Sequence, residues 1–420
     1  MNDGTKNTVQ TTSSEEIEEP PSKLSYKVTD YYYSRFKDHP QINKTFLPDD
    51  RGNIVLSCES GDHLGEEKQS PVENLGNDWH WQIKNSITTL EDISKHLVLT
   101  DEEKNFFKSK QQFKFRITPY YLDLIKKNPN SPIRKSLIPN NAEFNISNGE
   151  SIDPLGEDSD TCIPNLIKRY PDRVLYIATD FCSANCRYCC RSRLVGHEKY
   201  KDNFPEILEY LNTHSEIRDV IVSGGDPMTL SDKRLDFILS RLYAIPHIQI
   251  IRIGTKVPVV LPQRITTNLL NILNKFWDKL FINIHFIHED EISLDTKNAC
   301  LKLARLGIPL GSQTVLLKGI NDNIESMKKL VQKLLSCKVI PRYLYQMDKI
   351  QGGDHFRTSI EKGIEIIKGI QGFTSGMCCP KYVVDSHYGK IPIDIGSVRK
   401  KENGVYVLRN YEGKETEYRE

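Results

Sequence analysis

Short apolar runs rich in β-forming residues recur along the chain from residue 174 onward, and this repeat constrains the fold more than any other feature. The runs cover residues 174–178, 219–223, 248–254, 280–286, 309–317 and 338–347. Amphipathic stretches such as FPEILEYLNTH and NIESMKKLVQKLL lie between them, and the runs start roughly 30 residues apart after the first gap. Strand, helix, strand at this spacing is typical of the βα unit, and apolar strands with little alternation favour a parallel sheet covered by helices. We therefore predict an α/β fold, a partial (βα)6 barrel resembling part of a TIM barrel, and the sequence leaves a doubly wound open sheet as the alternative.

The segments around this repeat differ from it in composition. The first 25 residues are polar and rich in Ser, Thr and Glu, which predicts a disordered lead-in. Between residues 77 and 107, apolar residues recur at spacings of three and four, and Thr100 precedes an acidic first turn, so helices are expected there. The predicted organisation is a disordered lead-in at 1–25, a mainly helical N-terminal region at 26–165, the barrel core at 166–395 and a C-terminal tail at 396–420.

The bulk composition excludes several classes of protein. The net charge is +1, so nothing in the total charge indicates a nucleic-acid partner. No apolar run approaches the ~20 residues that a membrane span needs. The N-terminus lacks the apolar segment of a secretory signal, which predicts a cytoplasmic protein whose thiols stay reduced.

Three cysteines with close spacing follow the first strand run. Cys182, Cys186 and Cys189 stand three and then two residues apart, and Cys190 follows directly. A structural zinc ion takes four ligands, in most sites as two separated pairs, and no second pair stands at a useful spacing. A compact loop with three thiolates can reach three corners of an iron–sulfur cube and leave the fourth iron open for a ligand. We expect this open cluster rather than zinc, and a packing role for Cys190.

Polar residues follow other strand runs in the same way. The segment SGGDP, residues 223–227, follows the second run, and Asp348 follows the sixth. In parallel α/β folds, sites collect at the carboxyl ends of the strands, so these residues are expected to face the cysteine loop.

At this point the sequence resembles a known family. A Cx3Cx2C motif after the first strand of a βα barrel is similar to that of the radical S-adenosylmethionine enzymes, in which the methionine part of the cofactor chelates the open iron of a [4Fe-4S] cluster. SGGDP resembles the glycine-rich cofactor segment of that family. The resemblance implies that Ser223, Gly224, Gly225 and Asp226 contact S-adenosylmethionine, with the glycines allowing close approach of the backbone.

A more extensive resemblance, from about residue 77 to residue 393, is to the lysine 2,3-aminomutases, which also carry pyridoxal 5′-phosphate. The matching segments are KRYPDRVLYIATDFC, SGGDPM, RIGTKVPVVLPQRIT, GIPLGSQTVLLKGIND, RYLYQMD, GDHFRTSIEKGIEII and VVDSHYGKIPI. The resemblance implies that Lys390 holds the aldehyde, that Arg169 and Arg173 bind its phosphate, and that Gln313 lies in the active-site wall. The family often shows several glycines before this lysine, whereas this chain keeps only Gly389.

The same resemblance implies the substrate and the reaction. Arg191 matches the residue that pairs with the substrate carboxylate, and Asp348 and Asp385 match the two acids that hold the distal ammonium of lysine. Glutamate 2,3-aminomutases do not keep both acids, so a cationic side chain is expected: L-lysine, with L-arginine as the alternative. The implied reaction moves the α-amino group of lysine to Cβ to give β-lysine, through an aldimine of pyridoxal phosphate and a 5′-deoxyadenosyl radical.

The remaining expectations concern partners and alternatives. The reaction needs an external one-electron donor such as flavodoxin or ferredoxin, and the resemblance implies a homodimer. No zinc is expected, because Asn323 stands where clostridial-type relatives have a zinc-binding cysteine, and residues 391–420 contain no cysteine. The competing hypotheses are another radical S-adenosylmethionine reaction and a non-catalytic iron–sulfur protein.

Overall fold

The computed structural model describes residues 78–109, 114–127, 132–196, 200–402 and 405–419, with Gly76 and the short strands β1 (Leu47–Pro48) and β2 (Ile54–Val55). The chain divides into two units, Met1–Lys68 and Gln69–Glu420. In the first unit β1 pairs antiparallel with β2. The lead-in predicted at residues 1–25 lies outside the described residues. The following paragraphs concern the second unit.

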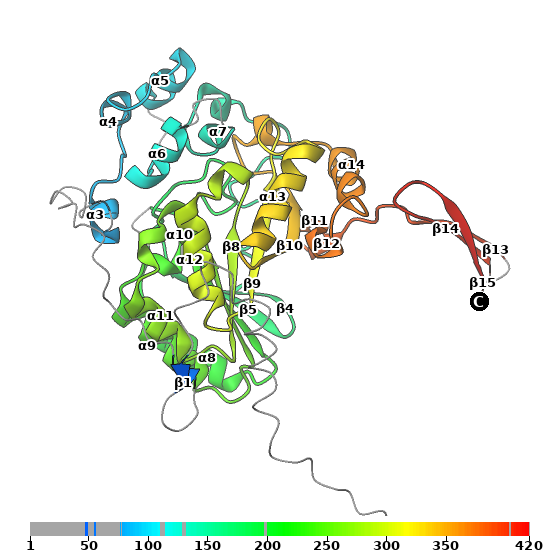
Figure 1. Cartoon of the computed structure of the whole chain (residues 1–420). Coiled ribbons are helices and arrows are strands. Elements are labelled where there is room, and N and C mark those ends of the chain that lie inside the picture. The colour runs from blue at the N-terminus through cyan, green and yellow to red at the C-terminus, as the bar shows by residue number, and fades with distance from the viewer. Residues whose placement is uncertain are drawn as a thin grey trace, which may run out of the picture. The chain divides into compact units, whose positions relative to one another are not determined.

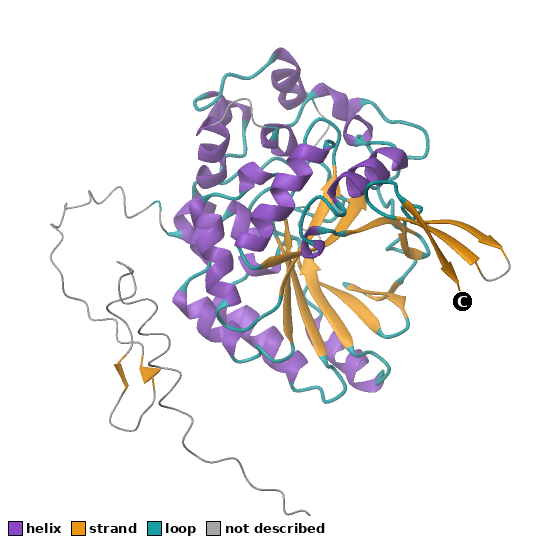
Figure 2. Cartoon of the chain, turned by 45° about the vertical axis from the view of Figure 1, so that its right-hand side comes forward, coloured by secondary structure: helices purple, strands orange, loops and turns teal. Residues whose placement is uncertain are grey.

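A ten-stranded sheet with seven consecutive parallel strands forms the centre of this unit (Figures 1 and 2). The parallel strands, in spatial order, are β5 (Arg173–Thr179), β6 (Asp219–Gly224), β7 (Ile250–Thr255), β8 (Leu280–His285), β9 (Leu310–Leu316), β10 (Val339–Gln346) and β11 (Lys381–Ser386). At one edge the antiparallel strands β4 (Leu166–Tyr170) and β3 (Thr161–Ile163) precede β5, and at the other β12 (Gly389–Pro392) folds back on β11. The sheet order runs from β12 to β3 without closing, which confirms a partial barrel.

Helices follow each of the first six parallel strands. They are α8 (Phe204–Thr213), α9 (Asp232–Tyr243), α10 (Val257–Val260), α11 (Thr267–Asn274), α12 (Leu294–Ala304), α13 (Ile324–Ser336) and α14 (Ile360–Ile370), with two helices after β7. In α13 the buried side chains Met327, Leu330, Val331 and Leu334 recur at three and four residues, so one apolar stripe packs on the sheet. Figure 2 shows the helices covering one face of the strands. The six predicted βα units are confirmed, and β11 is a seventh parallel strand that the sequence reading missed.

Short helices precede the barrel and share its core. They are α3 (Trp79–Lys84), α4 (Leu90–Ser94), α5 (Asp101–Lys108), α6 (Pro119–Lys127), α7 (Ile133–Leu137) and the 3-10 helix η1 (Asn141–Phe144). Thr100 and Glu103 form a reciprocal capping box at the start of α5, in agreement with the helix start predicted there. Buried Tyr121, Ile125 and Leu137 belong to the same apolar cluster as the barrel helices. The helical region is therefore packed on the barrel rather than separate from it.

The C-terminal segment predicted as a tail contains a second sheet. Strands β13 (Val398–Glu402), β14 (Val405–Arg409) and β15 (Glu415–Arg419) form an antiparallel meander. The ring of Tyr411, in the turn before β15, packs edge-on against Phe373 after α14. Among the described residues, no helix is long and apolar enough to cross a membrane.

Candidate active site

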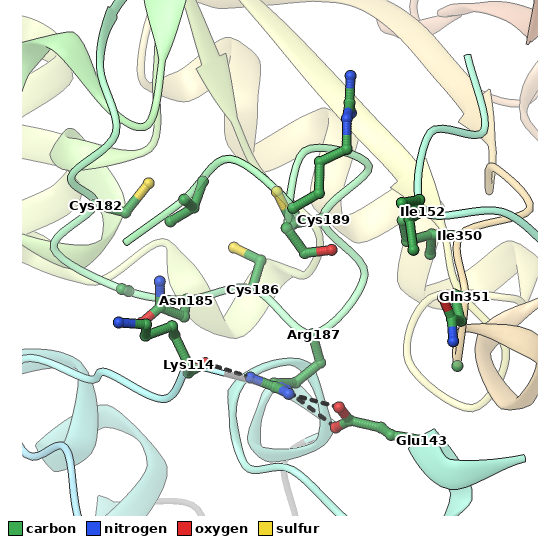
Figure 3. A pocket seen from close by; sticks show the side chains of 15 residues that line it. Lys114, Glu143, Ile152, Cys182, Asn185, Cys186, Arg187, Cys189, Ile350 and Gln351 are labelled. Atoms are coloured by element: carbon green, nitrogen blue, oxygen red, sulfur yellow. Dashed lines mark hydrogen bonds and ion pairs between the residues drawn. The ribbon is translucent and has the colours of Figure 1, made fainter. Parts of the chain in front are cut away.

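The cysteine loop leaves the carboxyl end of β5 and lies at the rim of the barrel. Cys182, Cys186 and Cys189 line one cavity of about 360 Å³. Figure 3 shows their three side chains directed toward a common space, while Arg187 points the opposite way. The loop therefore presents three sulfur atoms together, as the sequence predicted.

Arg187 fixes this loop to the N-terminal helices. Its Nε and Nη2 donate to the two carboxylate oxygens of Glu143 in η1, at 3.0 and 2.5 Å, and its Nη1 donates to the carbonyl of Lys114 at 2.8 Å. Both side chains of the ion pair are almost fully buried, 4% exposed for Arg187 and 3% for Glu143. The backbone N–H of Arg187 donates to the carbonyl of Ser136. A bidentate pair of this kind holds the loop in one orientation.

Burial and neighbouring thiol groups raise the pKa values of Cys182 and Cys189. Burial and the neighbouring Cys186 raise the pKa of Cys189 to about 11. Burial, Asp226 and the other two cysteines raise the pKa of Cys182, and the Arg116 guanidinium opposes this increase. Three thiolates at one cavity would need a compensating positive charge, which iron would supply.

The glycine-rich segment after β6 packs against the cysteine loop. A Cβ atom on Gly225 would lie 2.3 Å from the carbonyl oxygen of Phe181, and one on Gly224, whose φ is +116°, would lie 2.3 Å from that of Thr179. The N–H of Gly225 donates to Thr179 and that of Asp226 to Phe181. Both glycines thus allow this segment to approach the backbone just before Cys182, and their predicted contact with the cofactor stays a prediction.

Asp226 is held by the chain itself. Its carboxylate accepts hydrogen bonds from the hydroxyl of Thr255 and from the backbone N–H groups of Met228, Lys256 and Val257. Burial raises its pKa, and these four donors oppose that increase. The carboxylate therefore anchors the segment after β6 to the end of β7, and its predicted contact with the cofactor stays a prediction.

Two polar residues lie side by side on the neighbouring strands β8 and β9. His285 and Gln313 are paired in the register of these strands. The ring of His285 stacks on Tyr188 of the cysteine loop, with centroids 5.5 Å apart. Burial and the charge of Lys256 lower the pKa of His285 to about 3, so the ring is neutral, and its buried Nε2 has no hydrogen-bond partner among the residues that the structure describes. This nitrogen is suited to bind a ligand beside the cysteine loop.

At the far edge of the sheet, the β11–β12 hairpin carries Lys390. Lys390 pairs directly with Asp385 in the antiparallel register, and its Nζ lies 3.1 Å from Asp385 Oδ2. The backbone N–H of Lys390 donates to the hydroxyl of Tyr170 at 2.9 Å. Gly389 has φ +95° and lies so close to Tyr170 that a Cβ atom would clash, so this position suits glycine.

Asp348 follows β10 and lies beside this hairpin. Both Asp348 and Asp385 line a cavity of about 790 Å³. Burial and the charge of Asp385 raise the pKa of Asp348 to about 7, and the nearby Arg191 and Lys390 oppose this increase. The structure thus brings together four residues that the sequence predicted to act on the substrate or the aldehyde.

Arg191 has an internal acidic partner that the sequence reading did not foresee. Its Nε and Nη2 donate to the carboxylate of Glu157, with a shortest distance of 2.5 Å, and the Glu157 side chain is 6% exposed. Burial opposes the charge of Arg191, but the Glu157 carboxylate raises the pKa of the guanidinium. Cys190 is affected by the same guanidinium. Burial raises the pKa of the Cys190 thiol, and the charge of Arg191 opposes this increase. One edge of Arg191 is therefore occupied by Glu157.

The two arginines predicted to bind phosphate differ in their surroundings. Arg169 donates to Asp160 at 2.6 Å, to the carbonyl of Ser386 at 3.0 Å and to the carbonyl of Leu155. Arg173 stacks on the ring of Tyr170, with Cζ 3.7 Å from the centroid, and its side chain is 36% exposed. Arg169 thus supports the turn before Lys390, and Arg173 is the more accessible of the two guanidinium groups.

Comparisons with known proteins agree with this geometry. The Radical SAM superfamily matches residues 176–331, and the family described as lysine-2,3-aminomutase matches residues 367–420. An L-lysine 2,3-aminomutase of Clostridium subterminale is 45% identical over 353 residues, which cover 82% of this chain and 84% of that protein. The chain belongs to the lysine 2,3-aminomutase family. It is therefore an isomerase of the radical S-adenosylmethionine type.

Two further relatives show the range of this aminomutase family. An L-lysine 2,3-aminomutase of Bacillus subtilis is 41% identical over 355 residues, covering 83% of this chain and 75% of that protein. A glutamate 2,3-aminomutase of Clostridioides difficile is 38% identical over 403 residues, covering 94% of this chain and 93% of that protein. Relatives with either name are thus similar to most of this chain.

Membership of the radical S-adenosylmethionine family implies a [4Fe-4S] cluster and S-adenosylmethionine, and the residues of this aminomutase fit both. Cys182, Cys186 and Cys189 offer three thiolates at one cavity, and the unpartnered Nε2 of His285 lies on the adjacent barrel wall. The roles of the individual residues stay predictions.

The structure also shows which residues the sequence reading missed. Glu157, Glu143 and His285 make or offer polar contacts around the site, but none belongs to a motif that the sequence analysis used. Glu143 and Glu157 lie in the region before the barrel, and only the folded chain brings them to the cysteine loop and to Arg191. The sequence offered one signal for these three residues: His285 stands at the end of a predicted strand, where polar residues of a site are expected.

Proposed function

We propose that this aminomutase uses pyridoxal 5′-phosphate as a further cofactor and converts L-lysine to β-lysine. The observation that carries the proposal is the contact of Lys390 Nζ with Asp385, 3.1 Å apart, at a cavity that Asp348 also lines. A lysine that can hold an aldehyde and two carboxylates that can hold a distal ammonium thus lie at one edge of the barrel.

The side chains around Lys390 suit the phosphorylated aldehyde. Pyridoxal phosphate, when bound, supplies an aldehyde that condenses with amines and a ring that delocalises an unpaired electron. Lys390 would hold the aldehyde carbon through Nζ, next to the Tyr345 ring 5.6 Å away. Arg173 would pair with the phosphate, and Arg169 would keep the turn at Ser386 in place by its bond to that carbonyl.

The substrate would be held at both ends. Glu157 occupies the Nε–Nη2 edge of Arg191, so the remaining edge of the guanidinium would pair with the α-carboxylate of the substrate. Asp348 and Asp385 would pair with the ε-ammonium. A neutral or acidic side chain would leave these two carboxylates uncompensated in a partly buried site, which disfavours it.

The cysteine loop would carry the radical chemistry. The cluster and S-adenosylmethionine, when bound, supply the radical that takes a hydrogen atom from the substrate. Cys182, Cys186 and Cys189 would hold three iron atoms, and His285 with Gln313 would line the cofactor on the barrel side. Tyr188, stacked on His285, keeps the loop and the wall in contact.

L-Arginine stays a second candidate for a specific reason. The cavity at Asp348 and Asp385 continues to Asp354 and Glu361, and its volume of about 790 Å³ leaves space beyond a lysine side chain. Glu361 in this lining could pair with a longer cationic tail, whereas Asp354 is already paired with Arg357.

Anaerobic turnover with lysine, arginine, glutamate and tyrosine offered side by side tests the proposal. We expect conversion of lysine, and a visible absorbance band of the protein-bound aldehyde that Lys390→Ala abolishes. Conversion of arginine alone would replace the substrate, and a Lys390→Ala protein that keeps the band would remove the pyridoxal site from this hairpin. Conversion of glutamate would contradict the role of the two aspartates.

We also propose the broader setting. The cluster needs an external one-electron donor, for which a flavodoxin or a ferredoxin is suitable, and the protein would act in the cytoplasm as a homodimer. The chain would be organised as the four regions predicted from the sequence, with the pyridoxal site inside the core at residues 166–395. Analytical ultracentrifugation and reduction assays with each donor test these points.

A further inference from the structure

A second cavity opens on the cysteine loop, on the side of the N-terminal helices. Its volume is about 650 Å³, and Phe106 and Phe107 of α5 belong to its lining. Of the three cysteines, all of which the structure describes, Cys182 alone lines both this cavity and the one of about 360 Å³. The Cys182 end of the loop is therefore the end that meets this outer cavity.

The chain segment with two cationic residues is fixed to the same loop. The carbonyl of Lys114 accepts a hydrogen bond from Arg187 at 2.8 Å, and the carbonyl of Arg116 accepts one from the backbone N–H of Asn185 at 3.0 Å. Both donors belong to the cysteine loop, and both cationic residues line the outer cavity. These backbone bonds therefore hold Lys114 and Arg116 beside the loop.

The two side chains offer positive charge to an outside partner. The guanidinium of Arg116 stacks on the ring of Phe181, with Cζ 4.7 Å from the centroid, and Lys114 is exposed. Within the described part of the chain, neither side chain forms an ion pair with a carboxylate. One acid, Asp180, also lines the cavity, so its described lining has two cations against one carboxylate.

Aromatic rings form the apolar part of this opening. Phe106, Phe107 and Phe115 line it, and the ring of Phe107 packs edge-on against that of Phe115, with centroids 5.1 Å apart. An apolar centre with a polar rim is typical of protein–protein interfaces. We call the surface made by these three rings with Lys114 and Arg116 the outer face.

We propose that the outer face is the docking surface for an acidic protein that carries single electrons, and that the electron enters the cluster site on its Cys182 side. The inference rests on the function proposed above, which needs an external electron donor. It deepens that function, because it names the surface where the donor docks and the charge that the donor presents.

Charge and position both favour this surface. Complexes that transfer electrons bury small areas, so steering by a few opposite charges has a large share in how fast they form. The cavity at Asp348 and Asp385 shares no described lining residue with the outer cavity. A carrier on the outer face therefore leaves the proposed substrate site open, and both partners can be bound at once.

A flavodoxin is a suitable carrier for the test. Its fully reduced flavin, the hydroquinone anion, gives up one electron and becomes the neutral semiquinone, and the cluster gains that electron. No bond forms or breaks and no proton is exchanged in this step. The outer face thus has to hold the carrier only for the time of one electron transfer.

Anaerobic stopped-flow reduction of the cluster-loaded protein tests the inference, with flavodoxin hydroquinone as the probe and loss of cluster absorbance as the signal. We expect Lys114→Glu to lower the second-order rate constant about tenfold at low salt, because steering becomes repulsion. The difference should shrink in about 0.5 M salt, where charges are screened over a few ångströms. Lys114→Gln, which only removes the charge, should lie between Lys114→Glu and the wild type.

Lys368→Glu is the matched control, since it makes the same charge change elsewhere. This exposed lysine stands in the last turn of α14, which leads back to the start of β11 and thus to the end of the barrel opposite the cysteine loop. We expect the wild-type rate for this variant. Equal rate constants of Lys114→Glu and Lys368→Glu would overturn the inference, and so would a wild-type protein that flavodoxin cannot reduce.

Reduced methyl viologen, a small cation that needs no docking surface, separates docking from damage to the cluster. We expect it to reduce the Lys114→Glu protein at least as fast as the wild type. A tenfold slower reaction with viologen as well would overturn the inference, because Lys114 would then act on the cluster itself. Lysine turnover with viologen as the donor tests the proposed function separately, since a lack of turnover there contradicts the substrate assignment whatever the rates with flavodoxin.

Discussion

The buried ion pair between Arg187 and Glu143 offers the sharpest test of how the cluster loop is held. Glu143→Ala removes the carboxylate that forms a bidentate pair with the guanidinium of Arg187, whose side chain is 4% exposed. Breaking a buried pair by removing one partner costs about 3–5 kcal/mol, because the remaining charge is desolvated without compensation. The hydrogen bond from Arg187 to the carbonyl of Lys114 stays, so we expect the lower part of this range, about 3 kcal/mol.

Urea unfolding of the purified protein measures this loss. With a slope of about 3 kcal/mol per M, the transition of the barrel unit should move down by roughly 1 M urea. Because the same pair orients the loop with Cys186 and Cys189, we also expect less iron per chain after anaerobic reconstitution. Glu365→Ala is the matched control: this glutamate pairs with Lys362 on the surface, and its loss should cost under about 1 kcal/mol.

Two outcomes would refute the reasoning. A shift no larger than that of the Glu365→Ala control would show that the buried pair does not stabilise the fold. Unchanged iron content in a clearly destabilised Glu143→Ala protein would show that the loop keeps its position without this contact. A double variant, Glu143→Leu with Arg187→Met, should recover part of the stability, since an apolar pair leaves no buried charge.

Three further predictions concern the site. Gly225→Ala should lower the yield of iron-loaded protein severalfold, because its Cβ would lie 2.3 Å from the backbone of the cysteine loop; Gly376→Ala, where the space is open, is the control, and equal iron content in both would contradict the packing. The KM for lysine should fall as pH rises through about 7, because Asp348 then ionises and attracts the substrate ammonium; Asp348→Asn should flatten this profile in initial-rate measurements, and an unchanged profile would assign the titration to another group. Cys186→Ser should abolish the iron–sulfur absorbance while Cys190→Ser should keep it, and loss in both would make Cys190 a ligand.

The repeat of apolar runs was sufficient to predict the barrel, because each strand buries its side chains between neighbouring strands and helices and thus leaves a local record in the sequence. The seventh parallel strand, β11, was missed since it follows a loop with two adjacent cysteines and lacks a helix after it. The segment predicted only as a C-terminal tail forms β13, β14 and β15. The pairing of such strands depends on their register, and the sequence of a short polar strand specifies its register only weakly.

The sequence by itself was sufficient to predict which residues would carry the chemistry, because Cys182, Cys186 and Cys189 stand on one loop and Lys390 stands within a recognisable motif. It could not determine what surrounds them. Only the tertiary structure decided that Glu157 forms an ion pair with Arg191 and that Lys390 forms one with Asp385. The physical reason is that ligand spacing on one loop is a local property of the chain. The pair of Arg191 with Glu157, by contrast, joins segments that only the folded barrel brings together, and the pair of Lys390 with Asp385 depends on the register of the β11–β12 hairpin.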